Sequence, residues 1–294
     1  MSQELLDLLT KAIDIVRASM AEPEPVVQEP VVQEPVGFFV DKSKFPPEMG
    51  DVLDLLQSPD WPEATPSVLI CDENSEFDKT ERAMGIIDYF SLENKRVLDF
   101  GCGEGHLAAT VKSGSVGYDI VRSGNLLWES QEEYLLTTDF DKVLRNAPYD
   151  TIILFDVLDH CKSPVETLTQ VKSVCSPNTQ VLVRCHSWMS RHGSHLYKKA
   201  NKAWIHLFFS EDELAQMGLA IEQPLQKYYF PLGEQKKWFT EAGFNIVKEN
   251  AIKSAVEQFF RNPKLASRLK GGHKDFPEFQ MSQSFNDYTL TAKL

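Results

Sequence analysis

The sequence predicts an α/β fold, a doubly wound and mostly parallel sheet of seven strands with helices on both faces. Two observations carry this prediction. From Asn94 onward, short apolar runs alternate with amphipathic helical patterns, which is the rhythm of βαβ units. The first apolar run, RVLDF at residues 96–100, is followed by glycines at every second position from 101 to 105. Such a sequence is expected at the first strand-to-helix turn, and ligands bind at that edge of the sheet.

The individual elements follow from the same patterns. Apolar runs predict strands at residues 95–100, 115–120, 133–140, 149–158, 179–186 and 244–252, and the C-terminal residues 284–294 alternate like a seventh strand. Helical patterns cover residues 80–90, 103–113, 163–175 and 232–243. Ser163 is the expected N-cap of its helix, with Pro164 at the first helical position.

Composition shifts divide the chain further. Residues 1–21 predict an amphipathic helix, and residues 22–36 repeat EPVVQ, which favours an extended spacer because of its regular prolines. Residues 37–92 form an acidic accessory region, and residues 93–294 form the sheet domain with insertions at about 186–230 and 254–280. The favoured interpretation is a tether with a frayed helix at its end. The alternative is a docking helix, through which the N-terminal helix and spacer would contact a protein partner.

Charge and cysteine content exclude several classes. The net charge is −13, but residues 1–94 alone hold 20 acids against 6 bases, so the rest of the chain is close to neutral and can meet an anionic partner. No apolar run is long enough to span a membrane. The five cysteines are odd in number and form no CxxC pair, which argues against a disulfide framework and favours a cytoplasmic location.

Two acids narrow the choice of ligand. Asp119 closes the second predicted strand, where a carboxylate can accept hydrogen bonds from both hydroxyls of a ribose. Asp99 ends the first strand directly before the glycines and would repel the pyrophosphate of a dinucleotide. A cationic ligand therefore fits better than a nicotinamide cofactor, and a dehydrogenase is the weaker alternative.

The stretch VLDFGCGEG at residues 97–105, followed by GYD at 117–119, resembles the cofactor site of class I, Rossmann-like methyltransferases that use S-adenosylmethionine. The resemblance implies that the turn holds the amino-acid end of the cofactor, that Asp119 binds the ribose and that Asp139 lies beside the adenine. It also implies that the segment FDVLDH at residues 155–160 lines the cofactor and faces the substrate. The residues so assigned to the cofactor are Asp99, Gly101, Cys102, Gly103, Gly105, Asp119, Asp139, Phe140, Phe155 and Asp156.

The substrate side is predicted from a basic run. Residues 184–209 contain five Lys or Arg residues, four histidines and no acid, and they begin at the carboxyl end of a core strand. The candidate catalytic residues are His160, His186, Arg191, His192 and His195. A histidine there could act as a general base while the cations hold an anionic substrate. The alternative is structural, with the histidines filling the fold and the lysines solvated.

A metal site built from His186, His192 and His195 is disfavoured, because the run at residues 184–209 that contains them has no acid. We therefore expect no metal. The predicted function is direct methyl transfer from S-adenosylmethionine to an N or O nucleophile of an anionic substrate such as a nucleotide or RNA. A catalytically inactive scaffold or sensor that binds the same cofactor is the second hypothesis.

Overall fold

The computed structural model describes residues 38–64, 76–129, 133–186, 188, 190–191, 193–221, 232–253, 265 and 283–293. Residues 38–294 form one compact unit. The predicted N-terminal helix, the EPVVQ spacer and almost all of the second insertion lie outside the described residues, as does His192.

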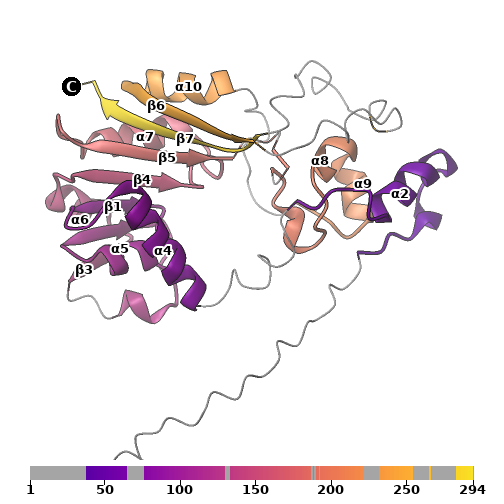
Figure 1. The fold of residues 1–294 in the computed structure, drawn as a ribbon, viewed down its shortest axis with the longest axis horizontal. Helices are drawn as coiled ribbons and strands as arrows, with labels where there is room; N and C mark the ends of the chain where they lie inside the picture. The colour runs from indigo at the N-terminus through magenta and orange to yellow at the C-terminus, as the bar shows by residue number, and fades with distance from the viewer. Residues whose placement is uncertain are drawn as a thin grey trace, which may run out of the picture. The chain divides into compact units, whose positions relative to one another are not determined.

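A sheet of seven strands is the centre of this unit (Figure 1). Its strands are β1 (Val97–Phe100), β2 (Ser115–Tyr118), β3 (Tyr134–Thr137), β4 (Thr151–Phe155), β5 (Gln180–Cys185), β6 (Phe244–Lys253) and β7 (Gln283–Ala292). Their order is β3-β2-β1-β4-β5-β7-β6. Strands β1 to β5 pair in parallel, and β7 runs antiparallel to both β5 and β6. The predicted mostly parallel sheet is confirmed.

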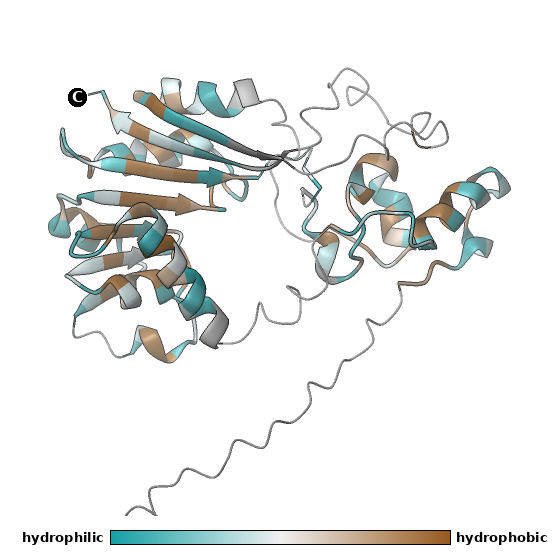
Figure 2. Ribbon diagram, in the orientation of Figure 1, coloured by the Kyte–Doolittle hydropathy of each residue, from teal (hydrophilic) through white to brown (hydrophobic). Residues whose placement is uncertain are grey.

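The sheet buries apolar side chains on both faces, as its near-continuous apolar strands require. Leu98 and Ile152 belong to the core on one face, whereas Val97 and Ile153 belong to the core on the other. Figure 2 shows β4 and β5 as apolar along most of their length. The flanking helices are α4 (Glu76–Phe90), α5 (His106–Val111), α6 (Phe140–Asn146), α7 (Pro164–Lys172) and α10 (Leu232–Glu241).

The N-terminus of α7 was predicted correctly from its capping residues, whereas α6 was missed. The Ser163 side chain accepts a hydrogen bond from the Glu166 N–H and Pro164 is the first residue of α7, as predicted. Helix α6 was not predicted, because the third strand was expected to continue to Phe140. The strand instead ends at Thr137, and the Asp139 side chain caps α6 by accepting a hydrogen bond from the Asp141 N–H.

A second hydrophobic core joins two segments that are far apart in the sequence. The first segment contains η1 (Lys42–Lys44), η2 (Pro47–Met49) and α2 (Gly50–Gln57), and the second contains η4 (Leu196–Lys198), α8 (Ile205–Phe208) and α9 (Glu211–Gln216). Trp61 is fully buried here, donates a 2.9 Å hydrogen bond from Nε1 to the Ala203 carbonyl and packs edge-on against Phe208. Part of the acidic accessory region and part of the first insertion therefore fold together.

Among the described helices, none combines the length and apolar character that crossing a bilayer requires.

Candidate functional site

The three glycines of the turn after β1 share a positive φ but differ in the space around them. Gly101, Gly103 and Gly105 all have positive φ angles, a conformation that disfavours residues with a Cβ. A Cβ at Gly101 would lie 2.4 Å from Val157 Cγ2, and one at Gly105 would lie 2.3 Å from Leu136 Cδ1. A Cβ at Gly103 would meet no described atom within 4 Å. The turn is therefore packed against protein at both ends and open in the middle.

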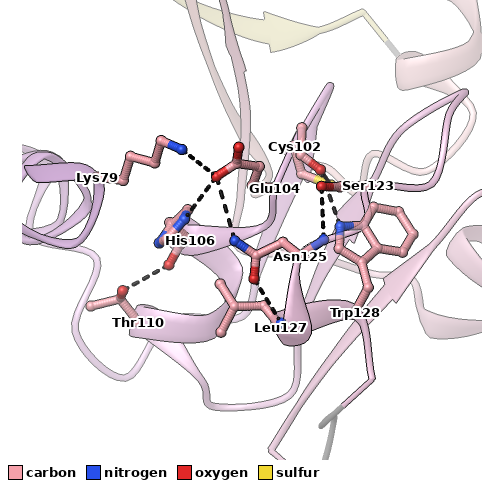
Figure 3. Close-up of polar contacts among 10 residues, drawn as sticks. Lys79, Cys102, Glu104, His106, Thr110, Ser123, Asn125, Leu127 and Trp128 are labelled. Carbon is pink, nitrogen blue, oxygen red and sulfur yellow. Dashed lines mark hydrogen bonds and ion pairs between the residues drawn. The ribbon is translucent and has the colours of Figure 1, made fainter. Parts of the chain in front are cut away.

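A polar network braces this turn from outside (Figure 3). Glu104 Oε2 lies 2.6 Å from Lys79 Nζ on α4 and 3.2 Å from His106 Nε2 on α5, and it accepts a longer contact of 3.5 Å from Asn125. The hydrogen bond from the Lys79 ammonium holds the pKa of Glu104 below its ordinary value. Trp128, in η3 (Leu126–Trp128), donates to the Gly103 carbonyl at 3.1 Å. Glu104 was not predicted as a site residue, although it lies inside the glycine motif.

Two acids flank the open part of the turn. Asp119 follows β2, and its Oδ2 accepts a 2.8 Å hydrogen bond from the Gly103 N–H. Asp99 is 9% exposed, and its pKa is raised to about 7 by burial and by the charge of Asp119. Neither carboxylate forms an ion pair with a Lys, Arg or His of the described residues. This edge of the sheet holds uncompensated negative charge, which is suited to a cationic ligand.

The remaining residues assigned to the cofactor are more dispersed. Cys102 is half-buried at the turn, and burial raises the pKa of its thiol. Phe140 packs against Tyr118, with ring centroids 5.5 Å apart. Phe155 lies under the guanidinium of Arg184, 4.7 Å from its ring centre. Asp139 serves as the α6 N-cap.

Asp156 and His186 meet at the carboxyl ends of β4 and β5. His186 Nε2 lies 3.2 Å from Asp156 Oδ1, and this contact becomes an ion pair when the imidazole is protonated. Burial alone would raise the pKa of Asp156, but His186 and Arg184 outweigh it and lower that pKa. Asp156 has a φ of +57°. A non-glycine residue in this region costs backbone energy that functional sites often retain. The pair lies where substrate was expected.

Two further histidines surround a buried acid beside this pair. Asp159 Oδ2 lies 3.6 Å from His160 Nε2 and 3.7 Å from His195 Nε2. The ring centroids of His160 and His195 are 4.9 Å apart, and that of His186 is 6.0 Å from His195. Burial, together with the neighbouring His160 and His186, lowers the pKa of His195 to about 4, so its ring is neutral at pH 7.

Three of the five residues predicted for the substrate side therefore come together: His160, His186 and His195. Asp159 was missed as a functional residue, and its signal was present in the segment FDVLDH at residues 155–160. That segment follows β4, whose neighbour β5 leads into the histidine-rich run. Because parallel neighbours end at the same edge, an acid there can reach histidines that are distant in sequence.

The predicted cations have other contacts. Arg191 donates to the Glu63 carbonyl and lies over the Trp204 ring at 5.6 Å. Lys202 donates a 3.1 Å hydrogen bond to the Ser58 carbonyl. Both side chains thus tie the first insertion to the segment before α4.

Residues 76–249 match the methyltransferase domain family, and this match covers more than half of the chain. The chain belongs to this methyltransferase family. The membership confirms the class I, S-adenosylmethionine-dependent family predicted from the sequence. It also agrees with the seven-stranded sheet and with the position of the glycine turn.

Curated relatives and solved structures resemble this methyltransferase more distantly. Two tRNA U34 carboxymethyltransferases, from Pectobacterium atrosepticum and Pectobacterium carotovorum, are each 29% identical over 126 residues, which is 38% of this chain. The chain spans 38% of the length of these relatives.

Two solved structures show partial similarity to this chain. A methyltransferase from Archaeoglobus fulgidus has a TM-score of 0.46 and 16% identity, covering 77% of this chain and 100% of that one. The magnesium protoporphyrin IX methyltransferase from Synechocystis, with bound S-adenosylhomocysteine, has a TM-score of 0.43 and 15% identity, covering 75% and 89%.

Proposed function

We propose that this protein binds S-adenosylmethionine at the glycine turn and transfers its methyl group directly to an N or O nucleophile of an anionic nucleotide or RNA. The observation that carries the proposal is the pair Asp99 and Asp119. They lie at the ends of β1 and β2, with Gly103 bound to Asp119 between them.

The turn fits the cofactor in shape and charge. Bound S-adenosylmethionine supplies a methyl group already activated by a sulfonium, and it carries a primary ammonium. Asp99 would attract that ammonium, since its own burial leaves it in need of a positive neighbour. Asp119 keeps acceptor capacity for ribose hydroxyls beyond its bond to Gly103. The missing side chain at Gly103 leaves the middle of the turn open to such a ligand.

On the acceptor side, the proposed roles follow from charge. A hydroxyl must lose its proton when its oxygen accepts a methyl group, and a protonated amine must lose a proton before its nitrogen can attack. His186 would take that proton, and the Asp156 carboxylate 3.2 Å away would stabilise the imidazolium that results. His160 and His195, in the same cluster, would face the acceptor and orient it.

A nucleotide or RNA is favoured by two features. Residues 184–209 hold five Lys or Arg residues and no acid, and this run starts in β5, next to the proposed acceptor site. The partial similarity to the tRNA U34 carboxymethyltransferases also suggests RNA as an acceptor.

The first experiment is calorimetric titration of the purified protein with S-adenosylmethionine and S-adenosylhomocysteine, with NAD as a negative control. We expect binding of both sulfur ligands and none of NAD. Asp119→Ala should weaken binding by about tenfold to 100-fold, because it removes charge-assisted hydrogen bonds. Asp88→Asn is the matched control, since Asp88 is an exposed acid on α4 away from the turn.

Protein that binds the cofactor is then incubated with isotopically labelled S-adenosylmethionine and with total tRNA, total RNA or nucleotides. Transfer of label that His186→Gln abolishes supports the proposal. A folded protein that binds neither sulfur ligand would refute it. Cofactor binding without transfer to any acceptor would favour the scaffold or sensor.

A further inference from the structure

Asp159 and His160 follow β4, and His195 precedes η4. Their ligand atoms are spaced slightly more widely than those around a bound tetrahedral ion. Each of Asp159, His160 and His195 offers one ligand atom, and these atoms all lie within 4.8 Å of one another. A tetrahedral ion with bonds of about 2.0 to 2.1 Å holds its ligand atoms about 3.3 Å apart. The two distances from Asp159 Oδ2, 3.6 and 3.7 Å, exceed that separation by only a few tenths of an ångström.

Within this cluster, the buried carboxylate of Asp159 is the group that a cation would stabilise. It is 8% exposed, and neither of its carboxylate oxygens accepts a hydrogen bond from the described part of the chain. A buried carboxylate without hydrogen bonds is costly unless an opposite charge compensates it. Both oxygens are shielded from solvent, whereas the side chains of His160 and His195 are 33% and 23% exposed. An ion could therefore enter from the histidine side.

The backbone holds the ligands from two sides. Asp159 and His160 lie in a turn closed by the hydrogen bond from the His160 N–H to the Val157 carbonyl, at 3.0 Å. His195 comes from the start of η4, with a φ of +55°. That conformation is uncommon outside glycine and asparagine, and strained positions of this kind are concentrated at ligand clamps.

From this geometry we propose that Asp159, His160 and His195 bind a divalent transition-metal ion of the zinc class. Two imidazoles and one carboxylate select such an ion over Mg²⁺ or Ca²⁺, which prefer oxygen ligands. Three protein ligands leave at least one coordination position open. The open position would accept an oxygen or nitrogen atom of the acceptor, or a phosphate oxygen, beside the Asp156–His186 pair. This site was not predicted from the sequence, because a metal was considered only at His186, His192 and His195 and Asp159 was overlooked.

The test uses untagged full-length protein that has been stripped with a chelator and dialysed. Co²⁺ is the probe, because its visible absorption reports both binding and geometry, and Zn²⁺ is then titrated in competition. We expect one equivalent of Co²⁺ to bind and Zn²⁺ to displace it. Asp159→Asn and His160→Gln should each weaken Co²⁺ binding by at least about tenfold, since each removes one of three ligands. His106→Gln is the matched control, because His106 lies at the glycine turn and contacts Glu104 instead.

Circular dichroism of each variant establishes that it is folded, and His160→Gln keeps the test decisive if the buried Asp159 variant is not. Failure of the wild-type protein to bind one equivalent of Co²⁺ would overturn the proposal. Equal binding by the wild type and folded His160→Gln would overturn it as well. The affinity of the stripped protein for S-adenosylmethionine is measured in parallel, so that a failed metal site and a failed methyltransferase assignment are told apart.

Discussion

Replacing Asp99 with asparagine should make the protein without cofactor more stable, by an amount that grows with pH. Burial and the Asp119 charge raise the pKa of Asp99 from 3.8 to about 7. Between these values the folded state binds more protons at this site than the unfolded state, so the wild type loses stability as pH rises through that window. Each pH unit contributes about 1.4 kcal/mol. Asparagine cannot ionise, and the advantage of Asp99→Asn should grow by about 2 to 3 kcal/mol from about pH 5 to about pH 8.

Urea unfolding followed by circular dichroism, at constant ionic strength and without cofactor, measures this difference. Asp88→Asn should follow the wild type at every pH. A stability difference between Asp99→Asn and wild type that is the same at both ends of the pH range would refute the reasoning. The same ionisation governs binding, because a cationic ligand attracts the carboxylate and not the acid. Wild-type affinity for S-adenosylmethionine should therefore weaken as pH falls below about 7, and the variant should bind weakly throughout.

Three further predictions concern the turn and the second core. Gly105→Ala should destabilise the fold by about 2 to 3 kcal/mol, because the added Cβ would clash with Leu136. Gly103→Ala should cost only about 1 kcal/mol, from its backbone conformation. Equal losses of stability for the two variants in urea unfolding would contradict this. Trp61→Ala should cost about 3 to 5 kcal/mol, and an unchanged unfolding midpoint would show that the second core is not cooperative with the sheet. Glu104→Gln should weaken S-adenosylmethionine binding about twofold to fivefold in calorimetry, and unchanged affinity would exclude a bracing role.

Local chemistry is what the sequence could predict. The Ser163 cap, the Pro164 start and the glycine turn each depend on residues a few positions apart. The alternation of strands and helices was predicted from the βαβ rhythm, because short connections keep successive elements close together. Even the missed helix α6 had its signal in Asp139, which was assigned to a ligand instead of to a cap.

Long-range pairing could not be predicted in the same way. Trp61 and Trp204 mark apolar segments, but nothing in their neighbourhoods says that the segments share one core. Arg191 and Lys202 were counted as cations for a substrate, and the structure shows them bound to backbone carbonyls of the other segment. The role of Asp159 was missed for the same reason, because its contact with His195 depends on where the chain turns after β5.

Val157 packs against Gly101 and so connects the glycine turn with the segment that follows β4. Val157 lies between Asp156 and the Asp159–His160 turn, and its methyl groups leave no room for even one added carbon on Gly101. A glycine turn that shifts toward β4 must therefore push on the segment that carries the acids. Among the described residues, this packing is one contact through which a shift of the glycine turn would reach Asp156 and Asp159.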